Sequence, residues 1–584
     1  MFQNLFRKAR GLRFPKKQEL AAIPHYLTRK EWVVFVTILT ALVITTFIIL
    51  GKINSNFIIE VPASGGSITE GIVGTPRFVN PVLALSDTDD DLVSVVFSGL
   101  VRKMPDGSIV PDLAESYEIS SDGLTYTFKL HEKLTFHDGE PLTADDVIFT
   151  IEKIQDPLLK SPRRVEWEGV EVEKIDDLTI SFTLRQRFAS FLDNATIGIL
   201  PYHIWKDIPI EEWNFSEYNS KAIGSGPYLV KDIDKKSSGA PSSYTLKSFS
   251  KFTLGKPFVN RITFNFYVNE DDMIRAYKNR SVESMSAITP EKARELEESG
   301  ARIETTTLPR IFGLFFNQNQ SPVFLDKSVI SAFNTVIDKD RIINEVLYNY
   351  GKTIDSPIPK TLLDGTSFNT EETKMASIDE AVSILEKNGW SRGEDGIMIK
   401  KGKSGNTRLE FSISTGDAPE LKRSGEIIKE NLEAIGADVE LKIFEIGVLN
   451  QNVIRPRKYD VLLFGQIIST ENDLFAFWHS SQRNDPGLNI ALYTNTKADT
   501  YLEKAQGLLS SEDRLANYVK FEQVIKDDNA AVFIYSPDFI YVLPKKLKGL
   551  TVDHIVEPHD RLATVYKWYI ESDAVWKIFA RSNE

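Results

Sequence analysis

Residues 121–143 read SDGLTYTFKLHEKLTFHDGEPLT, and this stretch decides the fold class. Its first half alternates between apolar and polar residues, as a β-strand with one buried face does. The apolar residues of that face are Leu124, Tyr126, Phe128 and Leu130. Asp138-Gly139 predicts a turn, and Thr143 with Asp146 three residues later predicts the capped start of a helix. The stretch therefore predicts a strand, a turn, a second strand and a capped helix.

Helices and strands keep alternating toward the C-terminus. Residues 376–390, ASIDEAVSILEKNGW, predict an amphipathic helix that Gly389 closes. Residues 424–444 predict a helix that ends at Gly436 and a strand after it. The mostly apolar run DVLLFGQII at 460–468 predicts a buried strand. This alternation favours an α/β fold with mixed sheets.

The length and the charge of the chain limit its possible domain organisation and partners. A chain of 584 residues is too long for one hydrophobic core, so we expect two to four domains or lobes. Residues 1–30 carry a net charge of +7, the whole chain carries −13, and the remainder therefore carries −20. Such an acidic body does not suit a phosphate backbone, and we expect no nucleic-acid partner. The chain has no cysteine, so neither disulfides nor a lipid-modified cysteine are expected.

A run of 19 residues without a charge, Trp32 to Leu50, follows the basic segment. As a helix it spans about 28 Å, close to the thickness of a bilayer core. A buried core helix and a cleaved signal peptide are the alternatives, but the apolar region of a signal peptide is only about 7–15 residues long. We expect a transmembrane signal anchor at 32–50, with a basic cytoplasmic segment at 1–31. Residues 51–66 are expected to be a linker to an extracytoplasmic body.

The opening stretch belongs to a longer pattern. Residues 78–157 read FVNPVLALSDTDDDLVSVVFSGLVRKMPDGSIVPDLAESYEISSDGLTYTFKLHEKLTFHDGEPLTADDVIFTIEKIQDP. GSGPY at 224–228 and the segments 316–359 and 521–550 follow in the same order. This pattern resembles the extracellular solute-binding proteins of family 5, the binding subunits of ABC importers for peptides, nickel and related solutes. One departure is Val-Ile-Ser-Ala at 329–332, where the family often has Val-Arg-x-Ala.

The resemblance implies a periplasmic-binding-protein-like type II fold, with two α/β lobes, a hinge and an inserted third lobe. The expected boundaries are lobe I at 64–103, 220–308 and 536–584, lobe II at 104–219, and lobe III at 309–535.

The resemblance also implies a function. The expected protein is a monomer and not an enzyme; it needs no cofactor or metal and closes around a peptide or related solute. Its expected partners are an ABC permease and the ATPase of that permease. The alternative is an anchored ligand sensor or peptide-holding chaperone without a transporter.

The resemblance also directs attention to one loop. Oligopeptide-binding relatives have a Gly-Trp-x-x-Asp segment whose Asp pairs with the peptide amino group, and Gln466 and Ser469 stand at the Trp and Asp positions here. Either Glu471 or Asp473 substitutes for the missing carboxylate, or the ligand lacks a free amine. The relatives' Arg for the peptide carboxylate is also missing, with Arg455 and Arg457 out of register. The expected ligand-binding residues are Phe78, Asn80, Phe312, Phe315, Asn317, Gln466, Ser469, Phe475 and Trp478. For any one of these aromatic residues, packing in the core is the alternative role.

Other chemistry has little support in the sequence. It contains neither Gly-x-Ser-x-Gly nor His-Glu-x-x-His. The glycine-rich run at 396–404 has a spacer one residue too long for a phosphate-binding loop. His554 and His559, beside Asp553 and Asp560, are expected to be solvated loop residues and not metal ligands.

Overall fold

The computed structural model describes residues 28–187, 191–359, 376–402, 405–508 and 510–576. The chain divides into two compact units. The first consists of the residues up to Ala63 together with those from Glu571 onward, and the second is Ser64–Ile570. Each unit is described by itself.

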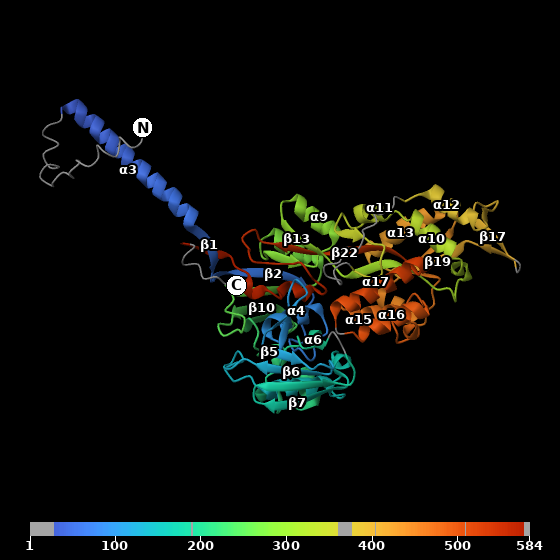
Figure 1. Ribbon diagram of the computed structural model, residues 1–584, viewed down its shortest axis with the longest axis horizontal. Helices are drawn as coiled ribbons and strands as arrows, with labels where there is room; N and C mark the ends of the chain where they lie inside the picture. Colours follow the sequence, from blue (N-terminus) through green and yellow to red (C-terminus); the bar gives the residue numbers. More distant parts are fainter. Residues whose placement is uncertain (1–27, 188–190, 360–375, 403–404, 509, 577–584) are drawn as a thin grey trace, which may run out of the picture. The chain divides into compact units, whose positions relative to one another are not determined.

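The first unit contains helix α3 (Arg29–Phe57) and two strands, β1 (Ile58–Ala63) and β23 (Glu571–Trp576) (Figure 1). Residues 29–52 of α3 are unburied, with a mean hydropathy of 2.8, and form the one span among the described residues long and apolar enough to cross a membrane. The two strands pair antiparallel, with Ile58 opposite Trp576. The expected linker at 51–66 thus includes the end of α3, strand β1 and the start of β2, and residues 571–576 pair with β1. This strand pairing joins segments more than 500 residues apart, which local sequence does not reveal. The expected domain boundaries stay a prediction.

The second unit is built on a mixed sheet of 12 strands among the described residues. Its main path is β20 (Asp438–Phe444), β19 (Glu410–Gly416), β21 (Val461–Ile467), β14 (Arg310–Phe316), β22 (Ala531–Leu543), β12 (Ser284–Ser286), β2 (Gly65–Val73), β11 (Val259–Tyr267), β10 (Pro241–Ser248) and β9 (Tyr228–Lys235). Two further strands, β13 (Arg302–Thr307) and β15 (Gly351–Thr353), pair with β22. The long strand β22 therefore joins two halves of the sheet.

Two neighbouring segments connect these halves. The chain passes from β13 to β14 through Leu308 and Pro309, and β22 passes Pro537. Before Pro537, β22 pairs with β14, and after it β22 pairs with β13. The backbone N–H of Leu308 donates to the carbonyl oxygen of Pro537 at 2.9 Å, so the two connections lie side by side.

Helices of the second unit pack on these strands or on other helices. They are α4 (Asp87–Val96), α8 (Glu270–Lys278), α9 (Pro290–Glu298), α10 (Lys327–Val336), α11 (Lys339–Glu345), α12 (Ile378–Lys387), α13 (Pro419–Ala434), α14 (Ile446–Val448), α15 (Glu471–Trp478), α16 (Thr496–Gln506) and α17 (Ser511–Asp528). The predicted helices at 376–390 and 424–436 are confirmed as α12 and α13, and Gly389 and Gly436 follow them with φ of +91° and +92°. The predicted buried strand at 460–468 is β21.

The opening stretch lies in a separate sheet with the order β5 (Ala114–Ile119), β6 (Thr125–Leu130), β8 (Thr179–Leu184) and β7 (Val170–Asp176) (Figure 1). Tyr126, Phe128 and Leu130 are buried as predicted. Thr143 and Asp146 form the predicted capping box of α5 (Ala144–Gln155). The predicted second strand is wrong. Only one bridge, between residues 135 and 141, forms there, because β6 pairs with β5 and β8 instead.

The remaining elements are short. They include β3 (Val101–Lys103), β4 (Ile109–Pro111), β16 (Trp390–Arg392), β17 (Met398–Gly402), β18 (Gly405–Arg408), α6 (Phe191–Asn194), α7 (Tyr202–Trp205) and the 3₁₀ helices η2 (Arg164–Trp167) and η9 (Pro558–Leu562). The glycine-rich run at 396–404 falls partly on β17, a sheet strand and not the start of a strand-to-helix turn. Residues 403–404 lie outside the described residues.

Candidate functional site

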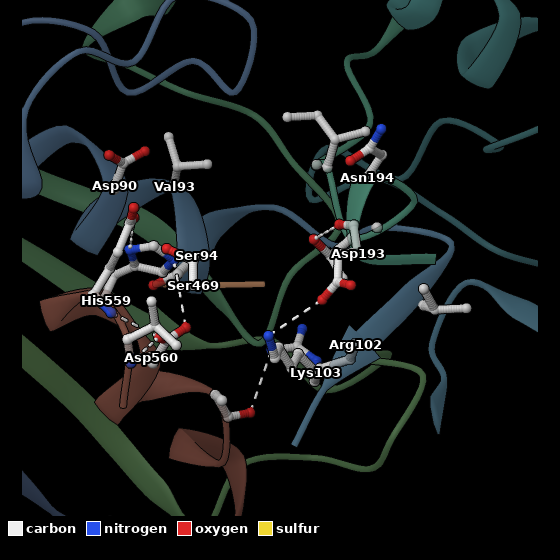
Figure 2. A pocket seen from close by; sticks show the side chains of 18 of the residues that line it. Asp90, Val93, Ser94, Arg102, Lys103, Asp193, Asn194, Ser469, His559 and Asp560 are labelled. Atoms are coloured by element: carbon white, nitrogen blue, oxygen red, sulfur yellow. Dashed lines mark hydrogen bonds and ion pairs between the residues drawn. The ribbon is translucent and has the colours of Figure 1, made fainter. Parts of the chain in front are cut away.

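A cavity of about 510 Å³ lies within the second unit. Its walls come from α4, the segment 97–103, the region of η2, residues 193–198, the loop 469–473 and the region of η9. Figure 2 shows two groups of side chains, with Asp90, Ser469 and His559 in one and Lys103 and Asp193 in the other. Ligand pockets have volumes of about 300–1,000 Å³, so a small solute fits this space.

The cavity loop 469–473 comprises the end of the connection from β21 and the first turn of α15. It is fixed at its start by Ile468, whose N–H donates to the carbonyl oxygen of Pro309 at 2.9 Å. It is fixed at its end by a capping box, in which the N–H of Thr470 donates to Asp473 at 2.8 Å. Burial raises the pKa of the Asp473 carboxyl despite this bond. The loop thus reaches the cavity from directly beside the connection between the sheet halves.

Two carboxylates and one imidazole meet at the cavity wall. One ligand atom from each of Asp90, Glu557 and His559 lies within 4.8 Å of the others. The Nδ1 of His559 is 3.4 Å from a carboxylate oxygen of Glu557. Burial raises the pKa of Asp90, and Glu557 adds to this effect. Burial opposes the charged form of His559, but the field of the nearby carboxylates outweighs it and raises the pKa of the imidazole above 6.5.

The permanent cations of the cavity are paired within its walls. Arg102 lies 2.8 Å from Asp112, and Lys103 lies 3.2 Å from Asp193. Arg163 is shared between Asp90 at 3.4 Å and Glu166 at 3.5 Å.

The cavity is therefore negative overall. Seven carboxylates line it against these three cations, and burial raises the pKa of Glu166 as well. A ligand with a positive group gains the most from this arrangement.

Of the nine predicted binding residues, Ser469 lines this cavity and the other eight do not. Two of those eight lie on the segment 78–80. Phe78 is buried and its N–H donates to Asp89 at 2.8 Å. Asn80 is fully buried, donates to Asn219 at 3.2 Å and accepts from the N–H of Val82. Both residues make contacts with other parts of the protein in this structure.

The predicted residues on β14 also make scaffold contacts. Phe312 stacks on Tyr535 with ring centroids 4.8 Å apart. Phe315 is buried near Trp478, another of the nine. Asn317 is buried and donates to the carbonyl oxygen of Arg457 at 2.8 Å. The binding role of these residues stays a prediction.

Gln466 and Phe475 flank the loop. Gln466 is 2% exposed, and neither polar atom of its side chain has a partner among the described residues. Phe475 stacks on His479 with centroids 4.1 Å apart.

The residues considered in place of the relatives' Asp and Arg make other contacts. Glu471 pairs with Arg514 at 2.6 Å, and Asp473 caps α15. Arg457 donates to three backbone carbonyl groups, and Arg455 lies 3.9 Å from Asp485. None of these residues except Asp473 lines the cavity.

Sequence reasoning missed Asp90, Glu557 and Arg163. The run DTDDD at 87–91 is the visible signal, but acidic residues at a helix start are explained by capping, and Ser86 and Asp89 do form a capping box. His559 was expected in a solvated loop, but it lies in the cavity wall beside carboxylates from two elements. The contact of residues 90 and 559 depends on folding, so no spacing rule predicts it.

Known proteins are similar to this chain in sequence and in fold. The oligopeptide-binding protein AppA of Bacillus subtilis is 26% identical over 523 residues, covering 87% of this chain and 92% of AppA. The structure of AppA in complex with a nonapeptide matches with a TM-score of 0.66 and 25% identity, covering 88% of this chain and 100% of that one.

Two further solved structures are similar. The ABC transporter substrate-binding protein CtaP of Listeria monocytogenes matches with a TM-score of 0.72 and 26% identity, covering 87% of this chain and 99% of CtaP. NikZ of Campylobacter jejuni, solved in complex with Ni(L-His), matches with a TM-score of 0.66 and 26% identity, covering 86% of this chain and 99% of NikZ. The expected type II periplasmic-binding-protein-like fold is confirmed.

The family model for bacterial extracellular solute-binding proteins, family 5, matches residues 108–487, which are more than half of the sequence. The chain therefore belongs to the bacterial extracellular solute-binding proteins of family 5.

Proposed function

We propose that the chain binds a peptide, or a related small solute with a positive group, in the cavity lined by Ser469 and His559. One observation carries this proposal: the loop 469–473 comes from one half of the sheet, and α4 and η9 come from segments outside that half. A solute in the cavity contacts both walls. Its extra affinity for the closed arrangement then shifts the population toward that arrangement.

The charge of the cavity supports a cationic group on the ligand. Ser469 offers no carboxylate for a peptide amine, but Asp90 and Glu557 also line the cavity. An ammonium group at this place offsets the burial and the repulsion from Glu557 that disfavour the charged form of Asp90. AppA binds oligopeptides, which have such a group at the N-terminus.

The proposed setting is outside the cytoplasm. Helix α3 supports a single-pass tether, with the basic residues before it on the cytoplasmic side. The closed body then delivers its solute to an ABC permease and its ATPase, and it does so as a monomer without catalysis.

The test is a titration of residues 64–570 with free short peptides and with the same peptides acetylated at the N-terminus. The expected result is a rise in melting temperature with the free peptides, corresponding to about 2.7 kcal/mol at about 100 times Kd. The acetylated peptides are expected to bind at least about tenfold more weakly, because the ammonium group is lost. Equal binding of both sets contradicts the assigned charge, and the absence of any peptide binding contradicts a peptide as the ligand.

A further inference from the structure

A second cavity, of about 740 Å³, has the opposite charge. Its lining includes four cations on the β9, β10 and β11 side of the sheet and in the loop between β10 and β11: Lys231, Lys247, Lys256 and Arg261. The other lining residues are small or amide-bearing, and no carboxylate is among them. All four cations are exposed. The body beyond residue 30 carries −20, so this is a basic surface on an acidic protein.

The cations have few partners of their own. Lys231 lies 3.8 Å from Asp232. Within the part of the chain that the structure describes, the side chains of Lys247, Lys256 and Arg261 form no ion pair or hydrogen bond. Lys247 and Arg261 stand directly opposite each other on β10 and β11. Like charges at opposite positions destabilise a strand pair, and an anion held between them removes that cost.

The basic cavity lies where the chain leaves the body. Gly66 and Ser67 line it, only three and four residues after Ala63, the last residue of β1. The other connection leaves at the same place, since a Cβ on Gly66 would lie 3.1 Å from the side chain of Ile570. Both covalent connections to the first unit therefore start beside the four cations.

The length of the connection limits how far this surface lies from a bilayer that holds α3. From Leu50 to the end of α3 the helix rises about 10 Å. Strand β1 adds about 20 Å, and residues 64–66 add about 10 Å. The basic cavity is thus at most about 40 Å of chain from the apolar run, a length of chain that keeps it near the headgroups.

We propose that this surface, defined by Lys231, Lys247, Lys256 and Arg261, docks onto the anionic phospholipid headgroups of the membrane that holds α3. The proposal rests on the tether of the proposed function. Charge complementarity supports it, since anionic headgroups attract basic clusters that lie next to a membrane anchor. A lipid surface offers many phosphates to cations spread over an open cavity. Docking orients the body, whose solute cavity is a separate site.

The test uses residues 64–570, which form a compact unit with hydrophobic cores of their own. This unit contains 507 of the 584 residues. Its binding is measured by co-sedimentation with vesicles of phosphatidylcholine alone and with about 30% phosphatidylglycerol. The variant is Lys247→Glu/Arg261→Glu. The matched control is Lys422→Glu/Lys497→Glu, which changes two exposed lysines on α13 and α16 that have no ion pair among the described residues.

The expected result is binding to the anionic vesicles that is at least about tenfold tighter than to neutral ones and that weakens as salt rises. The variant should lose about tenfold or more of this binding, while the control and the melting temperature stay unchanged. Equal loss in variant and control, or equal binding to both vesicle types, overturns the proposal. Competition by inorganic phosphate at micromolar concentration also overturns it, because it indicates a site for a single free anion.

A second arm separates this proposal from the proposed function. The full chain in nanodiscs, with and without the Lys247→Glu/Arg261→Glu change, is titrated with a peptide that the wild type binds. Unchanged peptide binding with lost vesicle binding supports the docking surface. Retained vesicle binding by the variant, with peptide binding intact, overturns the docking surface and leaves the solute site standing.

Discussion

The backbone N–H of Leu308 donates a hydrogen bond to the carbonyl oxygen of Pro537 at 2.9 Å. These residues belong to the two segments that join the sheet halves, and the next residue, Pro309, accepts from the N–H of Ile468. The cavity loop 469–473 is therefore fixed to the connection itself. A change of angle between the halves moves Ser469 relative to α4.

The two prolines at this connection should tune affinity. Pro309→Gly/Pro537→Gly adds backbone freedom to the open state, so closure around a solute costs more entropy. We expect Kd to rise about two- to tenfold in calorimetric titrations with a peptide that binds. Pro105→Gly, in the turn between β3 and β4, is the control and should leave Kd unchanged. An identical Kd in the hinge variant would show that the connection does not flex during binding.

The Asp90 carboxylate should lower the stability of the protein and strengthen ligand binding. Burial raises the pKa of its carboxyl, so the charged form costs free energy at neutral pH. Asp90→Asn should raise the free energy of unfolding at pH 7 by about 0.5–1 kcal/mol in urea titrations and weaken the binding of cationic peptides. Asp417→Asn, an exposed control, should change neither. A variant that binds as tightly as the wild type would place the ligand amine elsewhere.

His137 should make stability depend on pH. Burial lowers its pKa from 6.5 to about 4, and its Nε2 lies 3.0 Å from the carbonyl oxygen of Gly226. The folded state holds the neutral ring, so this contribution is fully present above pH 6.5 and is lost as the pH falls toward about 4. His137→Gln should reduce the slope of unfolding free energy against pH in this window. An unchanged slope would contradict the role of this ring.

Arg561 should be among the most sensitive core positions. Its buried guanidinium donates to Glu70 at 2.6 Å and to Asp91 at 2.9 Å. Arg561→Met leaves two buried carboxylates without their cation, which costs about 3–5 kcal/mol. Adding Glu70→Gln and Asp91→Asn should restore most of this loss in denaturant titrations.

The control for that prediction is Arg341→Met. Arg341 also pairs with two carboxylates, at 2.7 and 2.8 Å, but it is a more exposed residue. Its loss should cost less than about 1 kcal/mol. Equal costs at positions 341 and 561 would show that burial does not set the energy of these networks.

The elements that local chemistry decides could be predicted from the sequence. The apolar face of β6, the cap at Thr143 and the glycines that end α12 and α13 follow from spacing and turn preference alone. Features that depend on distant pairing could not. The segment 58–63 becomes a strand only because 571–576 lie opposite it, and β22 joins both halves as one uninterrupted strand.

The binding residues show the same limit. Aromatic and amide residues near the family motifs were expected at the site, but Phe315 and Trp478 fill a core and Asn80 holds a turn. Ser469 lies at the cavity because it follows the end of β21, next to the connection between the two sheet halves. Asp90 and His559 are more than 450 residues apart in the sequence, and only the contact of α4 with η9 brings them together.

The most direct test of the solute site is photo-crosslinking of a bound peptide that has a reactive group next to its N-terminal amine, mapped by mass spectrometry. Binding of the peptide amine in the 510 Å³ cavity predicts adducts within 469–473 and within 556–560 that excess unlabelled peptide removes. Competed adducts confined to any other surface, with both of these segments unlabelled, would contradict it.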